Sequence, residues 1–291
     1  MGASRPFHVK RVNLSMRKTT LTDQYIRLKN GFRLAYYDSG SAAGHLKTVV
    51  LLHGFCGSSA YWADLLPQLK EVARVVVPDL RAHGVSEPQN GQVYEMESFA
   101  ADILELLDHL ELKQAALIGH SMGGYIALAA LEKYPQRLNG LALLHSTALA
   151  DSDAAKDNRD KAVQTIKQEG IRPFIDNLVP KLFAPLHLEE MPELVQHVKA
   201  IGYETSSQGA AAAALGMKAR PDRTALLRNA AVPVLLAAGA QDQIVPIDST
   251  LHTAEGQPKV YTHIAEGAGH MGMLEAADSI AEAVQRFIGV L

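Results

Sequence analysis

The segment at residues 115–125 constrains the fold of this chain more than any other. A short apolar run, the pattern Gly119-x-Ser121-x-Gly123 and a helix-like spacing of apolar residues follow one another there. A strand that turns directly into a helix needs a tight bend with a strained apex, and glycines beside the apex avoid Cβ clashes. Such strain costs about 1–3 kcal/mol and persists mostly where it positions a functional group. The segment therefore predicts that the Ser121 hydroxyl stands clear of the end of a strand.

Short apolar runs alternate with helix-like segments along most of the chain. The sequence predicts strands at residues 48–52, 72–77, 115–118, 138–144, 232–238 and 259–264, and helices from about 59, 96–110, after 124 and 274–288. Such alternation is typical of βαβ units, so it predicts a mostly parallel sheet with helices on both faces. Two further β-rich runs flank Asn30-Gly31, which predicts an antiparallel hairpin at the start of the sheet.

The alternation stops over residues 147–220, where the pattern is helical throughout. We interpret this part as a helical insertion over the carboxyl ends of the strands, which divides the core into residues 21–146 and 221–291. Residues 1–20 contain basic but no acidic side chains, and we interpret them as a flexible tail. A mitochondrial-type presequence and a true start at Met16 are alternatives for that tail.

Composition narrows the classes of function. The formal net charge of −3 gives no electrostatic reason to expect nucleic acid or an anionic membrane as a partner. Cys56 is the only cysteine, so no intrachain disulfide can form, and the cytoplasm is the simplest location. No apolar run reaches the length of a membrane span. Because the histidines and carboxylates show no metal-ligand spacing, we predict that the protein binds no metal. We also predict that it uses no cofactor and that it is a monomer or a homodimer.

Two later loops supply the partners that a nucleophilic serine needs. In open α/β sheets the working residues lie on loops beyond the carboxyl ends of strands. Asp242 follows the strand at 232–238, and His270 follows the last strand. Ser121, Asp242 and His270 stand in the chain order expected of a triad built on such a sheet. His270 would take the proton of Ser121, and Asp242 would hold the imidazole in the correct tautomer.

The reaction also needs hydrogen-bond donors for the developing oxyanion. The backbone N–H groups of Met122, which follows the nucleophile, and Phe55, in the loop after the strand at 48–52, are predicted to supply them. Asp248 competes with Asp242 for the role of the acid. However, residues 246–249 are typical of a helix start, which favours capping for Asp248.

With these pieces in place, the chain resembles the α/β-hydrolase fold family, specifically its capped esterase and lactonase branch. The resemblance covers about residues 25–290. It rests on His53-Gly54-Phe55, Asp79-Leu80-Arg81-Ala82-His83-Gly84-Val85-Ser86, Gly119-His120-Ser121-Met122-Gly123-Gly124, Asp242 and His270. It implies an eight-stranded sheet and an inserted helical cap that roofs the pocket. Ala82 departs from the pattern, because the family more often has glycine there.

We therefore predict a serine hydrolase that cleaves a small, mainly apolar ester or lactone through an acyl-enzyme. Its pocket is expected to be lined by His145, Phe174, Leu178, Leu182 and Met271. A carbon–carbon bond hydrolase of meta-cleavage type, a cofactor-free perhydrolase or haloperoxidase, and a small-molecule receptor without turnover are alternatives that use the same fold. The serine at the bend disfavours chemistry that needs an aspartate nucleophile.

Overall fold

One sheet organises the computed structural model, which describes residues 17–40 and 47–291. Within these residues eight strands pair in the order β1-β2-β4-β3-β5-β6-β7-β8. They are β1 (Gln24–Arg27), β2 (Arg33–Asp38), β3 (Thr48–Leu52), β4 (Arg74–Pro78), β5 (Ala115–His120), β6 (Leu138–Leu144), β7 (Val234–Gly239) and β8 (Val260–Ala265). The pairs that involve β2 are antiparallel and the others are parallel, which confirms the predicted eight-stranded, mostly parallel sheet. Most of the predicted N-terminal tail lies outside the described residues.

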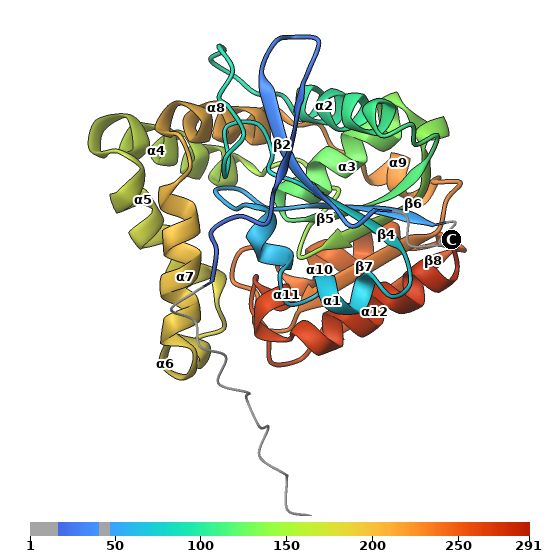
Figure 1. The fold of residues 1–291 in the computed structure, drawn as a ribbon. Coiled ribbons are helices and arrows are strands. Elements are labelled where there is room, and N and C mark those ends of the chain that lie inside the picture. Colours follow the sequence, from blue (N-terminus) through green and yellow to red (C-terminus); the bar gives the residue numbers. More distant parts are fainter. Residues whose placement is uncertain (1–16, 41–46) are drawn as a thin grey trace, which may run out of the picture.

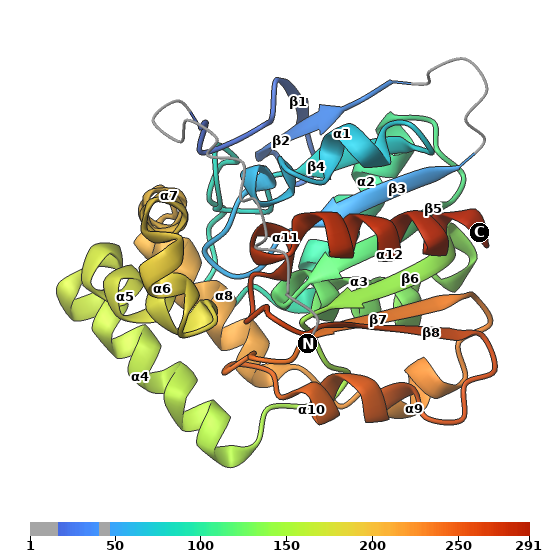
Figure 2. The same ribbon diagram turned by 90° about the horizontal axis from the view of Figure 1, so that it is seen from below.

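Helices cover both faces of the sheet, with α2 and α3 on one face and α1 and α12 on the other (Figure 1). The core helices are α1 (Leu66–Leu69), α2 (Met96–His109), α3 (Met122–Lys133), α9 (Thr224–Arg228), α10 (Ile247–Leu251), α11 (Gly272–Glu275) and α12 (Ala277–Gly289). The remaining helices are α4 (Asp153–Glu169), α5 (Ile171–Leu178), α6 (His187–Glu190), α7 (Pro192–Tyr203) and α8 (Ser207–Ala219). We call α4–α8 the helical layer. Figure 2 shows α4–α7 gathered beyond the end of the sheet to which the arrowheads of β3 and β5 point.

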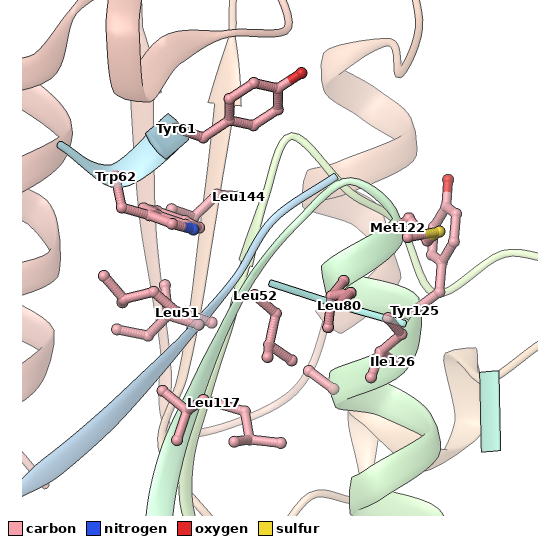
Figure 3. Close-up of a cluster of buried hydrophobic side chains, with 14 of the residues drawn as sticks. Leu51, Leu52, Tyr61, Trp62, Leu80, Leu117, Met122, Tyr125, Ile126 and Leu144 are labelled. Carbon is pink, nitrogen blue, oxygen red and sulfur yellow. The ribbon is translucent and has the colours of Figure 1, made fainter. Parts of the chain in front are cut away.

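The central strands are buried on both faces, which explains why they are continuous apolar runs. Every residue of β3, β5 and β7 is buried. In Figure 3, Leu51 points toward Trp62 on one face of the sheet, and Leu52 points toward Ile126 of α3 on the other. Each such side chain stabilises the fold by about 1.5–3 kcal/mol through burial. The core therefore fixes the strand ends from which the loops of the site extend.

Three local predictions differ from the structure in detail. The helix expected from about residue 59 is a 3-10 turn, Ser59–Trp62, followed by the four-residue α1. The helix expected over 274–288 is two helices, because Ala276 leaves the helical conformation at φ −139° and ψ 47°. Asp248 lies in the first turn of α10 and is not its N-cap, which is Pro246. The hairpin prediction is confirmed by the antiparallel pairing of β1 and β2.

An ion-pair cluster fastens both ends of the helical layer to the core. Asp151 precedes α4, and its carboxylate accepts hydrogen bonds from Arg159 Nε at 3.1 Å and from Arg220 Nη1 at 2.7 Å. Arg220 follows α8, and its guanidinium lies 3.8 Å from the ring centre of Tyr125 in α3. Because α3 also begins beside Ser121, the layer is held against the helix that follows the bend.

Candidate active site

The turn between β5 and α3 has the strained geometry that the glycine pattern predicts. Ser121 has φ 52° and ψ −115° and is partly exposed. A Cβ atom on Gly119 would lie 2.3 Å from the backbone of Gly123, and one on Gly123 would lie 2.2 Å from the carbonyl oxygen of Leu52. No larger residue fits either position without moving backbone. The two glycines therefore let the chain pass tightly behind Ser121.

Asp242 and His270 form a buried pair at the ends of β7 and β8. His270 Nδ1 lies 2.8 Å from Asp242 Oδ2, and the exposed fractions of the two side chains are 3% and 0%. The other carboxylate oxygen accepts the backbone N–H groups of Ile244 and Val245 at 2.8 and 2.9 Å. Burial alone would raise the pKa of Asp242, but the neighbouring imidazoles outweigh this effect and hold the pKa well below its usual range. The carboxylate is therefore ionised and able to orient His270.

The loop that carries His270 is bound to the bend that carries Ser121. The ring of His120, the residue before Ser121, bonds through Nε2 to the carbonyl oxygen of His270 at 2.9 Å. The backbone N–H of His270 donates to the carbonyl oxygen of Leu182 at 2.8 Å. Among the described residues the structure contains no hydrogen bond between the Ser121 hydroxyl and His270. Catalytic hydrogen bonds of this kind are often long without substrate and shorten when it binds.

Two backbone N–H groups beside Ser121 are free to bind an anion. Met122 begins α3, so its N–H has no acceptor within the helix. Phe55 lies in the loop after β3, and its N–H has no backbone acceptor in the part of the chain that the structure describes. That loop runs against the bend, since a Cβ atom on Gly54 would lie 3.3 Å from Ser121 Cβ. The geometry suits the predicted pair of oxyanion donors.

A cavity of about 480 Å³ lies between the helical layer and the loops of the site. Phe55 and Phe174 meet edge to face in its wall, with ring centres 5.9 Å apart, and Leu178 lies beside them. Gln243, the neighbour of Asp242, lines the same cavity. Its volume is in the range of small-molecule sites, and its wall combines apolar side chains with polar and basic ones.

Three residues predicted to line this cavity lie outside its wall. His145 is fully buried, at φ 50°, with Nδ1 3.5 Å from Asp242 Oδ2. Leu182 is buried and contributes the carbonyl oxygen that holds His270. Met271 is fully buried behind the same loop. The backbone N–H of His145 donates to the carbonyl oxygen of Ala237 in β7, and the place of His145 in the substrate pocket stays a prediction.

Two further histidines support the loops. His53 Nε2 accepts the N–H of Leu80 at 2.9 Å, and His83 Nδ1 donates to the carbonyl oxygen of Arg81 at 2.8 Å. Burial lowers the pKa of both imidazoles, that of His83 to about 4. Both rings are therefore neutral at pH 7 and act as fixed hydrogen-bonding groups.

Sequence reasoning missed Glu275, which organises the loop of His270. Glu275 Oε1 accepts the N–H groups of Gly269 and Met271, each at 3.0 Å. Its Oε2 accepts Ala184 N–H and contacts His187 Nδ1, each at 2.7 Å, and these two residues belong to the segment between α5 and α7. Nothing in the sequence distinguishes this buried glutamate from an exposed one, because its partners come together only in the fold.

The described residues contain no metal site, no reactive cysteine and no membrane-spanning helix. No group of three His, Cys, Asp or Glu side chains there could hold a metal ion. Cys56 is buried, and burial raises the pKa of its thiol, so it is a poor nucleophile. None of the helices in the described ranges is long and apolar enough to cross a membrane.

Comparisons with known proteins agree with this fold. A family model described as alpha/beta hydrolase fold matches residues 47–277. The dihydrolipoyllysine-residue acetyltransferase component of an acetoin cleaving system from Pseudomonas putida is 30% identical, over 89% of this chain and 67% of that protein. The 3-oxoadipate enol-lactonase 2 of Acinetobacter baylyi is 26% identical, over 70% of this chain and 82% of that protein. A malate-bound thermophilic esterase from Thermogutta terrifontis superimposes with a TM-score of 0.85 at 32% identity, over 92% of this chain and 98% of that one.

Proposed function

The chain belongs to the alpha/beta hydrolase fold family, and from that premise we propose that it is a serine hydrolase of small carboxylic esters or lactones. One observation carries the proposal. The buried 2.8 Å bond between His270 and Asp242 is held against the strained, partly exposed Ser121 through the contact of His120 with the His270 carbonyl. This arrangement supports the roles of nucleophile for Ser121, base for His270 and orienting acid for Asp242.

The reaction proceeds in two half-reactions. Ser121 Oγ attacks the carbonyl carbon as its proton passes to His270, and the N–H groups of Phe55 and Met122 stabilise the oxyanion. The bond to the leaving oxygen then breaks, and His270 returns the proton to that oxygen. Water attacks the acyl-enzyme in the same way, releasing the acid and restoring Ser121. In a lactone, the leaving oxygen stays attached to the acyl chain.

The names of two similar proteins favour an ester or a lactone as the substrate of this chain. The esterase similar to this chain at 32% identity and the lactonase at 26% both act, by their names, on a carbon–oxygen acyl bond. The cavity of about 480 Å³ limits the substrate to a small molecule. The helical insertion at residues 147–220 would act as a cap, because α4 and α5 form one wall of that cavity.

Initial rates on p-nitrophenyl esters from acetate to decanoate, and on simple lactones, test the proposal. Wild type should show a chain-length optimum. Ser121→Ala should lose at least about 10³-fold in kcat, because only binding and the oxyanion donors remain. Ser98→Ala, in α2, serves as the matched control and should retain wild-type rates. Equal activity of wild type and Ser121→Ala, or inertness of both, would contradict the proposal. In the second case, cleavage of a carbon–carbon bond in a diketone becomes the next reaction to measure.

A further inference from the structure

The cavity beside the site carries positive charge that ester hydrolysis does not require. Its wall contains Arg159 and Lys161 of α4 and Lys181 of the 3-10 turn Val179–Leu182 that follows α5, and it contains no carboxylate. Asn158 and Asn177 add amide groups to the same wall. A site that received only neutral, apolar groups would gain nothing from three cations in its wall.

The charge of Arg159 is not neutralised within its own cluster. Asp151 is buried and pairs with both Arg159 and Arg220, so two guanidinium groups share one carboxylate. Arg159 contacts Asp151 through Nε, and its two terminal amino groups donate to no acceptor in the described part of the chain. Asp151 thereby fixes the direction of the guanidinium and leaves its donors available. This is the geometry that binds a carboxylate with two parallel hydrogen bonds.

The charges of α4 are segregated around its axis. The cavity is lined by Ala155, Asn158, Arg159, Ala162 and Thr165, which recur at the spacing of one helical face. The acidic residues of the same helix, Asp153, Asp157, Asp160 and Glu169, are absent from the cavity wall, and two of them are paired elsewhere. Asp153 contacts Lys156 at 3.6 Å, and Asp160 contacts Lys218 of α8 at 2.6 Å. The charged side chains in the cavity wall are therefore all basic, even though the chain as a whole has a formal net charge of −3.

We propose that this cavity binds a carboxylate of the substrate, so that the hydrolase acts on a half-ester of a dicarboxylic acid or on a lactone that carries a carboxylate. Arg159 makes the direct contact, and Lys161 and Lys181 attract the anion. Phe55 and Phe174 pack on the carbon chain between the carboxylate and the reacting carbonyl. This inference rests on the proposed function, because it names the substrate class of the same site.

A matched pair of substrates separates this inference from the proposed function. The p-nitrophenyl half-ester of glutarate carries a carboxylate, and the corresponding ester of glutaramic acid carries a neutral amide of the same shape. Wild type should favour the half-ester in kcat/KM by about tenfold or more, the range of a hydrogen bond to a charged group. Arg159→Gln should abolish most of that ratio. Added salt should reduce it in wild type, since the lysines are exposed.

Controls and a binding measurement complete the test. Lys167→Gln, on α4 but outside the cavity, should leave the ratio unchanged. The double variant Lys161→Gln/Lys181→Gln replaces two exposed side chains and should lower the ratio without loss of folding. A ratio of one in wild type, with both esters hydrolysed by Ser121, overturns the inference and leaves the proposed function intact.

If the protein hydrolyses neither ester, calorimetric titration with glutarate measures binding of a carboxylate to the same site. Affinity for wild type that falls about tenfold in Arg159→Gln supports the carboxylate-binding site at Arg159, although the proposed hydrolysis fails. No binding by wild type at millimolar concentration, or equal binding by both proteins, overturns it.

Discussion

His145 Nδ1 lies 3.5 Å from Asp242 Oδ2, the oxygen that also accepts the 2.8 Å hydrogen bond of His270. The His145 ring is fully buried, and neither of its nitrogens has a hydrogen-bond partner in the described residues. Burial lowers the pKa of His145, with Asp242 opposing part of that shift. The His145 ring is therefore neutral at pH 7. The carboxylate of Asp242 thus has two imidazole neighbours, His145 and the proposed base His270.

Removal of this second imidazole should slow the reaction without weakening substrate binding. We expect His145→Ala to lower kcat about tenfold with little change in KM, because Asp242 gains freedom to move away from His270. His145→Gln, which keeps a polar side chain of intermediate size beside Asp242, should recover part of the loss. Gly272→Ala should mimic the defect, since its Cβ would lie 2.2 Å from His145 Nε2. Steady-state kinetics of the three variants would show whether kcat falls; an unchanged kcat in His145→Ala removes the role.

The glycine at the bend should be indispensable to folding. In Gly123→Ala the new Cβ would lie 2.2 Å from the Leu52 carbonyl oxygen, so the central strand β3 or the bend must move. We expect a loss of about 3 kcal/mol or more in the free energy of unfolding, as for other overpacked backbone sites. Gly289→Ala, which meets nothing within 4 Å in α12, is the control and should be neutral or slightly stabilising. Urea denaturation measures both; equal stability of the two variants would contradict the close contact.

Local signals in the sequence account for the parts of the fold that could be predicted. The strand at Thr48–Leu52 and the strand at Leu138–Leu144 are fixed by continuous apolar runs, and the bend at Ser121 by its two glycines. His145 and Glu275 could not be assigned, because their partners come from β7 and from the segment between α5 and α7. No spacing along the chain encodes such contacts. The charge on the cavity wall was missed for the same reason, since it depends on which face of α4 points inward.

Stability should fall on mild acidification because buried histidines resist protonation. The pKa of His83 is about 4 in the fold, against 6.5 in the unfolded chain, so between these values only the unfolded state takes up a proton. Stability is therefore complete above about pH 6.5 and is lost as the pH falls toward 4, by about 3 kcal/mol for this group. His83→Asn should be less stable at neutral pH but should lose less on acidification. Urea denaturation at several pH values measures the free energy of unfolding over this range. The control His252→Asn, at an exposed position, should show the same pH dependence as wild type. If His83→Asn also loses as much stability as wild type on acidification, His83 is not the group responsible.

Glu275 should matter both to stability and to turnover, because one buried carboxylate holds two segments together. In Glu275→Ala, the N–H groups of Gly269, Met271 and Ala184 lose their acceptor at once. We expect a loss of about 3 kcal/mol or more in stability, since buried donors left unsatisfied cost about 1–3 kcal/mol each. In protein that remains folded, kcat should also fall, because Gly269 and Met271 flank His270. Glu275→Gln keeps one acceptor oxygen and should be intermediate in both quantities. The exposed Glu282→Ala is the control, and an active, fully stable Glu275→Ala would show that the His270 loop is held by its contacts with His120 and Leu182 alone.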